Sequence, residues 1–356
     1  AVTAVTFALL LAGCAGNPEA TAPSIGASSA VASETPSTSP APIPIELPVA
    51  QDGAVTFANA ATQSKRIPAA AWQRVQDTIA ANSPVDIPTT IVIGPKTPTT
   101  TEQVLPLLEQ SYRLWEGFRQ PPRFSGMVYS AEDEEWAQAQ WPTVAADLGL
   151  QINPADYVGQ IRAGCQFDGD KATSCYGGMA QVFPNSDDGF AFYGVEGKFW
   201  SAKSLRNDGP WGPISQVVHE YTHNVQFAQW IGTSLKPGEN VRSDSAHHGM
   251  PCWFSEGQAN AIGIAVASPT SSTYATTRLD TVTRGINPNM PFKPSLTKFT
   301  ATALQSFLTG QDPQTCYDPK TNGDYQLGYS VGYAATEVLV AIGGPQSTMA
   351  LLALTS

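Results

Sequence analysis

Apolar residues recur with helical spacing in several stretches of the chain, and between these stretches they cluster in short runs typical of strands. Helices and strands alternate up to about residue 212, and one predicted helix is interrupted at Pro142. From residue 213 onward the predicted elements are mostly helical. We therefore expect an α+β fold. The predicted helices are 69–82, 101–118, 131–150, 213–231, 251–267 and 328–343, and the predicted strands are 89–94, 124–130, 177–184 and 189–195.

The first 14 residues form an apolar run that ends in Leu11, Ala12, Gly13 and Cys14. The run is too short to span a bilayer and is typical of a signal-peptide core. Its end resembles a bacterial lipobox, which implies cleavage before Cys14 and a lipid anchor at that cysteine, in the extracytoplasmic face of the cell membrane. The alternative is an ordinary secretory signal followed by a chance cysteine. Because no Met and no basic segment precede the run, we expect the chain to begin downstream of its true start.

Residues 15–65 are dominated by Ala, Ser, Thr and Pro and contain almost no aromatic side chains. Such a segment buries too little apolar surface to offset the entropy lost on ordering. We expect a disordered tether that is stiffened locally by proline and holds the folded part away from a surface. A low-complexity tail without this purpose is the alternative.

Composition narrows the class of partner. The net charge is -11 and the pI is about 4.8, whereas nucleic acid or an anionic membrane surface requires clustered Lys and Arg. We therefore expect no nucleic-acid partner. Only 14% of residues are charged and the chain has 30 glycines and 29 prolines, a balance that suits an extracytoplasmic protein.

The five cysteines also suit an oxidising compartment. Once Cys14 is set aside, the remaining four allow three pairings. We favour Cys165 with Cys175, which closes a short Gly/Asp-rich hairpin, and Cys252 with Cys316, which ties two loops together. A cysteine-rich metal site lacks the necessary C-x-x-C spacing.

Two of the four histidines lie in the segment VVHEYTHNVQ. His219 and His223 are four residues apart on a predicted helix, so both project from one face and can hold one metal ion. Glu220 lies beside them and is placed to take a proton from a metal-bound water. The alternative is an ordinary pair of histidines on a helix surface.

The residues downstream distinguish between metallopeptidase families. Metzincins continue as HExxHxxGxxH, but this chain has Gln226 and Gln229 at the corresponding positions. The segment WFSEGQA instead resembles the W-x-x-E-G-x-A segment of gluzincins, the thermolysin-like and peptidase MA-like enzymes. Glu256 in this segment lies 33 positions after His223. The resemblance implies zinc bound by His219, His223 and Glu256, with the site between a mixed-sheet N-terminal half and a mainly helical C-terminal half.

The same resemblance implies supporting roles. Asn260 occupies the position of an aspartate that hydrogen-bonds a ligand histidine in thermolysin-like enzymes. The segment with Tyr329, and with Leu339 and Gly344 ten and fifteen positions later, resembles a helix of the peptidase MA-like enzymes. Tyr329 is the candidate oxyanion donor, with Tyr325 and Tyr333 on the same face as alternatives, and packing in the core is an equal interpretation. An edge strand usually holds the substrate backbone, and residues 177–183 are the candidate. His247 and His248 in the loop before residue 251 are either near the site or simply solvated.

We therefore expect an extracytoplasmic zinc metallopeptidase that acts on peptides or proteins, bound to the membrane by its lipid or secreted. A zinc amidase of the cell wall and a non-catalytic binding or chaperone lipoprotein are the alternatives. The oligomeric state stays open. The expected organisation is a signal peptide over 1–14, a tether over 15–65, an α/β half over 66–230 and a helical half over 231–356.

Overall fold

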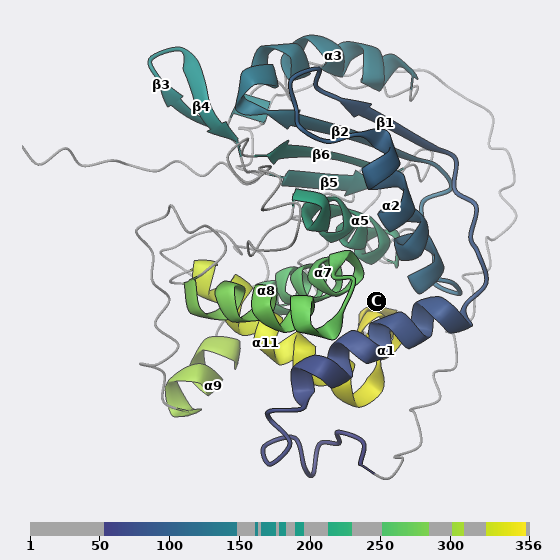
Figure 1. Ribbon diagram of the computed structural model, residues 1–356, viewed down its shortest axis with the longest axis vertical. Coiled ribbons are helices and arrows are strands. Elements are labelled where there is room, and N and C mark those ends of the chain that lie inside the picture. The colour runs from purple at the N-terminus through teal and green to yellow at the C-terminus, as the bar shows by residue number, and fades with distance from the viewer. Residues whose placement is uncertain are drawn as a thin grey trace, which may run out of the picture.

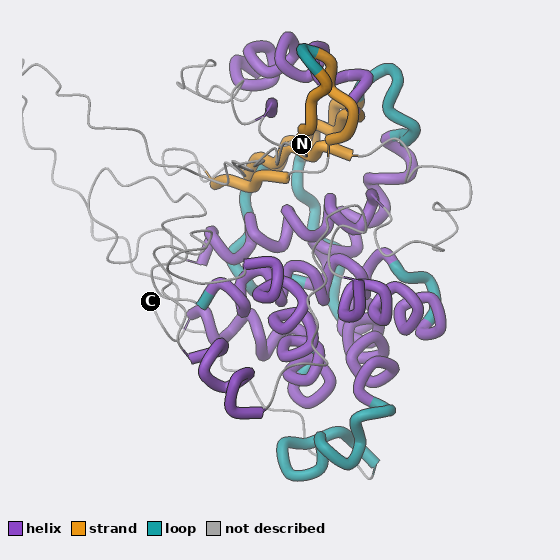
Figure 2. The backbone as a smooth tube through the Cα atoms, turned by 90° about the vertical axis from the view of Figure 1, so that its left-hand side faces the viewer, coloured by secondary structure: helices purple, strands orange, loops and turns teal. Residues whose placement is uncertain are grey.

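The computed structural model describes residues 53–147, 161–162, 165–175, 178–182, 189–195, 213–229, 251–284, 301–309 and 325–353. Within these ranges helices and two small sheets are combined, which agrees with the expected α+β class. The strands gather at one end of the molecule and the helices fill the rest (Figures 1 and 2). The predicted signal peptide, Cys14, His247, His248 and Cys316 lie outside the described residues.

The main sheet has four strands in the order β1-β2-β6-β5. Strands β1 (Thr89–Ile93), β2 (Phe124–Ser130) and β6 (Gly189–Val195) are parallel, and β5 (Gly178–Val182) pairs with β6 in the antiparallel direction. The sheet is therefore mixed, and β5 forms one edge.

Helices lie on both faces of this sheet (Figure 1). Helix α3 (Glu134–Asp147) packs on one face, while α5 (Pro213–Gln229) contacts β5 and β6 on the other. Every residue of β2 is buried, as expected for a central strand with both faces covered. Phe124 and Val128 belong to the larger core, whereas Met127 and Tyr129 belong to a smaller core beneath α3.

A second, two-stranded sheet projects beside the first (Figure 1). It consists of β3 (Cys165–Asp168) and β4 (Lys171–Cys175), a hairpin whose first and last residues face each other. Cys165 and Cys175 form the predicted disulfide at this position. Cys252 is also disulfide-bonded, and its pairing with Cys316 stays a prediction.

The remaining helices form the other layer: α1 (Ile67–Ala81), α2 (Thr101–Leu114), α7 (Cys252–Ala267), α8 (Ser271–Arg284), α9 (Ala301–Thr309), α11 (Tyr325–Gly343) and α12 (Pro345–Ala353). Helix α7 lies between α5 and α11 and is buried along nearly its whole length. Glycines permit the close crossing with α11, since a Cβ on Gly257 would lie 2.2 Å from the carbonyl carbon of Gly332.

Helix α1 packs on α11, α8 and α7, although it is the first helix of the chain. Its buried residues recur every four positions, at Ile67, Ala71, Val75 and Ile79. Two of its side chains also reach the C-terminal end of α7: Trp72 Nε1 donates to the carbonyl of Ser268 at 2.9 Å, and Gln76 Nε2 donates to the carbonyl of Ala265 at 3.0 Å. The division of the chain at residue 230 stays a prediction.

Two expectations are corrected. Residues 53–65 are part of the fold and not of a disordered tether: Val55 is buried in the larger core, and Asn59 Oδ1 accepts a hydrogen bond from the Thr56 amide at 2.8 Å. Helix α3 continues through Pro142 instead of breaking there. Pro142 is exposed, so water can satisfy the carbonyl group that proline leaves without a helical partner.

No helix among the described residues is long and apolar enough to cross a membrane.

Candidate metal centre

Helix α5 is buried on all sides, so it carries its polar residues into the interior. One face meets the sheet and α2, where the Tyr221 ring contacts Tyr112 and Phe124 at centroid distances of 4.7 and 5.1 Å. The opposite face carries His219 and His223 toward α7. Because α5 is packed on all sides, its buried polar side chains have little freedom to move.

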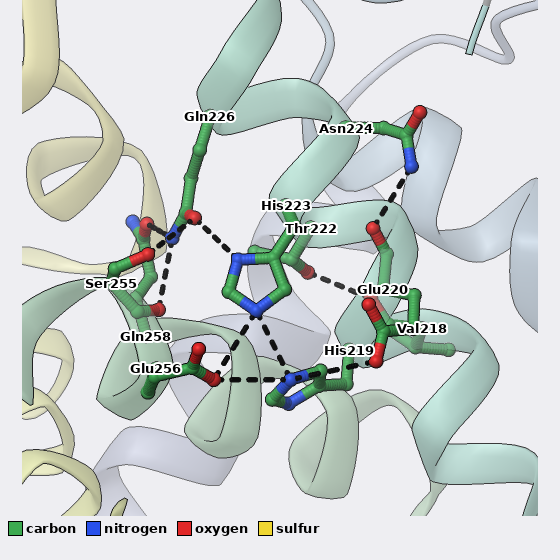
Figure 3. Close-up of polar contacts among 10 residues, drawn as sticks. All are labelled: Val218, His219, Glu220, Thr222, His223, Asn224, Gln226, Ser255, Glu256 and Gln258. Carbon is green, nitrogen blue, oxygen red and sulfur yellow. Dashed lines mark hydrogen bonds and ion pairs between the residues drawn. The ribbon is translucent and has the colours of Figure 1, made fainter. Parts of the chain in front are cut away.

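Three side chains meet between α5 and α7 (Figure 3). The Nε2 atoms of His219 and His223 are 3.1 Å apart, and Glu256 Oε2 lies 3.4 Å from the first and 3.3 Å from the second. All three side chains are buried. The sequence predicted this set, and the structure brings it together as a group able to hold a metal ion.

The spacing of the three atoms fits a small tetrahedral ion. Zinc binds imidazole nitrogen and carboxylate oxygen at about 2.0 to 2.2 Å, which places neighbouring ligand atoms about 3.3 Å apart at a tetrahedral centre. The observed separations of 3.1 to 3.4 Å agree with this value. The described residues offer two nitrogen atoms and one oxygen atom to such an ion. A tetrahedral ion held by these three alone would have a fourth position for water, as in hydrolytic sites.

The close approach of Gly263 to α5 sets this spacing. A Cβ on Gly263 would lie 2.7 Å from the carbonyl oxygen of Ser215 and 3.3 Å from the His219 amide nitrogen. Gly263 and Glu256 are seven residues apart on α7 and therefore lie on one face. The missing side chain allows α7 to approach α5 closely enough for Glu256 to reach both histidines.

Charge within the site favours deprotonated Glu256. Burial alone raises the pKa of this carboxyl group, but His223 and His219 hold it well below its usual range. Burial lowers the pKa of His223, and the neighbouring Glu256 carboxylate raises it to about 9. The site thus concentrates negative charge that a proton or a metal ion neutralises.

Glu220 lies beside the three ligand atoms without belonging to them. Its Oε1 is 4.0 Å from His219 Nε2 (Figure 3), and its side chain is buried against Gly178 of β5. Burial raises the pKa of Glu220, and the two histidines oppose that shift. A carboxylate with a raised pKa is a better proton acceptor near neutral pH.

Sequence reasoning missed one residue that contacts a ligand. Gln226 Oε1 lies 2.7 Å from His223 Nδ1, on the opposite side of the ring from Glu256 (Figure 3). In the sequence Gln226 served only to exclude the metzincin pattern. Its position three residues after His223, on the same helix face, is the signal that would have identified it.

Asn260 and Tyr329 are the other residues predicted to support the metal centre that the structure describes. Among the described residues, neither amide atom of Asn260 has a hydrogen-bond partner, nor has His219 Nδ1, so the expected bond from Asn260 to a histidine is not formed. All three atoms are buried. Tyr329 lies partly buried on α11, and its role as oxyanion donor stays a prediction. Tyr333, one turn later, is a core residue that stacks near Tyr274.

No protein-family profile, curated protein sequence or solved structure matches the chain. The function of the chain is therefore inferred from the site itself.

Proposed function

We propose that this chain is a zinc-dependent metallopeptidase with a gluzincin-like arrangement. The observation that carries the proposal is the triangle of His219, His223 and Glu256 with the Glu220 carboxylate beside it. Metal sites that serve only structure fill all four positions with protein ligands. Here three described ligands and an adjacent buried base favour hydrolysis.

Glu220 supplies the proton transfer. A zinc ion held by the three ligands would polarise the scissile carbonyl and lower the pKa of the attacking water. The Glu220 carboxylate accepts the proton of that water and then delivers it to the leaving amine, so it begins and ends the reaction ionised. Burial strengthens its basicity, because the raised pKa makes the protonated intermediate state accessible.

The edge strand β5 is the proposed binding element for the substrate. It lies at one edge of the main sheet as the described strands are ordered, and its first residue, Gly178, lies against Glu220. An extended peptide that pairs with this edge by β-augmentation would place a backbone carbonyl near the base. Main-chain pairing of this kind recognises peptides with little regard to side chain.

Localisation is the second part of the proposal. We infer that the protein acts at the extracytoplasmic face of the membrane, through a lipid on Cys14. The Cys165 to Cys175 disulfide and the disulfide-bonded Cys252 support an oxidising compartment. Cells that express the chain and are fed a radiolabelled fatty acid should label the wild type and leave Cys14→Ser unlabelled. Wild type without label, or equal label in the variant, contradicts the lipid anchor.

The test of activity is cleavage of a mixed peptide library by the full chain beside the Glu220→Gln variant. Both proteins are first loaded with zinc, and metal content is measured by elemental analysis. Cleavage by the wild type that disappears in the variant, with zinc retained in both, is the expected result. If zinc-loaded wild type cleaves no peptide, the peptidase assignment is wrong, and cell-wall peptides are the next substrates to test.

A further inference from the structure

The side-chain amide of Gln226 makes four hydrogen bonds in the buried space between α5 and α7. Its Oε1 faces His223 Nδ1 at 2.7 Å and accepts from Ser255 Oγ at 3.1 Å. Its Nε2 donates to the carbonyl of Ser255 at 3.1 Å and to Gln258 Oε1 at 2.7 Å. Gln226, Ser255 and Gln258 are fully buried, so water offers no substitute for these bonds.

The Ser255 carbonyl determines which way this amide points. A carbonyl oxygen only accepts, so the Nε2 end of Gln226 must face it. Turning the amide over would bring Gln226 Oε1 against that carbonyl, and each buried acceptor left without a donor costs about 1 to 3 kcal/mol. The oxygen of Gln226 is thereby held against His223.

The network continues to α12 in one direction. Gln258 Nε2 donates to Thr348 Oγ1 at 2.8 Å, and Thr348 Oγ1 donates to the carbonyl of Pro345 at 2.6 Å. The last group is again a carbonyl, so the direction of donation is fixed at both ends of the network. His223 Nδ1, which faces an acceptor at the start, must carry a proton.

A proton on Nδ1 assigns the other ring nitrogen its role. In the neutral imidazole the lone pair is then on Nε2, the atom that faces His219 and Glu256. We propose that Gln226 is a positioning residue that holds His223 in the Nδ1-protonated tautomer and directs Nε2 at the metal, with Gln258 and Thr348 fixing its amide. This inference rests on the proposed zinc site and adds a supporting residue to it.

The partner of His223 Nδ1 is a neutral amide, and this affects how strongly the histidine would bind a metal. A carboxylate partner raises the basicity of a ligand histidine more than an amide does. Replacing Gln226→Glu keeps an acceptor for His223 and adds charge, but it sets a second oxygen against the Ser255 carbonyl. Metal affinity and fold stability are therefore expected to change in opposite directions in this variant. A residue that only fills the core has no reason to separate the two quantities.

The experiment compares Gln226→Met, Gln226→Glu and the control Gln229→Met in the full chain. Gln229 lies one turn later on α5 and donates to the carbonyls of Arg119 and Val225, both at 2.7 Å, without reaching a ligand. The dissociation constant for zinc is measured by competition with a chelator, and stability of the metal-free form by urea unfolding. The absorption spectrum of the cobalt-loaded form reports ligand geometry.

We expect Gln226→Met to bind zinc about 10- to 100-fold more weakly, the usual effect of removing such a partner. Gln226→Glu should bind zinc at least as tightly as wild type while unfolding at lower urea, and Gln229→Met should leave zinc affinity and the cobalt spectrum unchanged. Wild-type affinity in Gln226→Met, or equal weakening in both Gln226 variants, overturns the inference alone. If wild type takes up no zinc, the proposed metallopeptidase fails with it.

Discussion

The backbone of Gly178, the first residue of the edge strand β5, lies directly against the carboxylate of Glu220. A Cβ on Gly178 would be 2.0 Å from Glu220 Oε1 and 2.7 Å from its Cδ. Only glycine leaves room for the buried carboxylate at this point. The strand that we propose to bind substrate therefore also determines where the proposed base lies.

Gly178→Ala should consequently impair catalysis while leaving the metal bound. The new methyl group would displace the end of the Glu220 side chain, which is easier to move than backbone, and none of the three ligands is in its way. A misplacement of about 1 Å is expected to lower kcat about 10²-fold. Peptide hydrolysis and zinc content of the variant are the measurements. Full activity with zinc bound would show that Glu220 does not need its present position.

A second prediction concerns the crossing of α7 and α11. Gly257→Ala would place a methyl group 2.2 Å from the carbonyl carbon of Gly332, where backbone has to move. Such overpacking costs about 1 to 3 kcal/mol of the free energy of unfolding. In an unhindered helix the same substitution would instead stabilise by roughly 0.5 to 1 kcal/mol. The sign of the change, measured by urea unfolding, distinguishes the two cases.

Gly343→Ala on α11 is the matched control. Its new Cβ would meet Ser347 Oγ at 2.4 Å, a hydroxyl group that can rotate away. This variant is expected to lose less stability than Gly257→Ala. Since Glu256 precedes Gly257, the first variant should also bind zinc more weakly, whereas the control should not. Equal effects of the two substitutions would contradict a backbone contact as the cause.

The three candidate ligands were predictable because their signal is local. His219 and His223 share a helix face by spacing alone, and Glu256 lies in a short recognisable segment. Gln258 and Thr348, in contrast, are 90 residues apart and meet only through the packing of α7 on α12. No periodicity within either helix indicates that contact.

The elements were easier to predict than their partners. The apolar spacing of residues 69–82 predicted a helix there, but not that the buried face of α1, which includes Val75 and Ile79, covers the C-terminal helices. The sequence also predicted strands at the positions of β5 and β6. It did not predict that β6 lies between β2 and β5, because that order depends on pairing between segments far apart in the chain. An amphipathic pattern indicates which face of a helix is buried, but it does not indicate which other element packs against that face.

A third prediction concerns an ion pair between α8 and α11, in which the carboxylate is fully buried and the arginine is partly buried. Arg278 Nε lies 2.6 and 2.7 Å from the two oxygens of Glu337, a fully buried carboxylate that also accepts from Tyr274 Oη at 3.0 Å. Arg278→Met should destabilise the fold by about 3 to 5 kcal/mol, because it leaves that charge without its partner. Unfolding in urea measures the loss. Adding Glu337→Gln should restore part of it, and a double variant no more stable than Arg278→Met would contradict the pair.

The final prediction is the pH dependence of the site. In the protein without metal, burial lowers the pKa of His223, but Glu256 raises it from its ordinary 6.5 to about 9. Because the folded pKa is the higher one, the protonated pair stabilises the metal-free fold fully below pH 6.5, and this contribution is lost as the pH rises to about 9. Zinc binds the deprotonated ring, so its affinity should increase over the same interval as the competing proton leaves.

Zinc titrations and thermal unfolding in chelator, both between pH 6 and pH 10, measure the two effects. Glu256→Gln removes the charge that raises the pKa of His223. Unlike wild type, the metal-free variant should keep its stability as the pH rises from 6.5 toward 9, because without that carboxylate the pKa of His223 is not raised in the same way. The same slope of stability against pH in both proteins would mean that a different group titrates. A zinc affinity independent of pH below 9 would mean that no proton leaves His223 when metal binds.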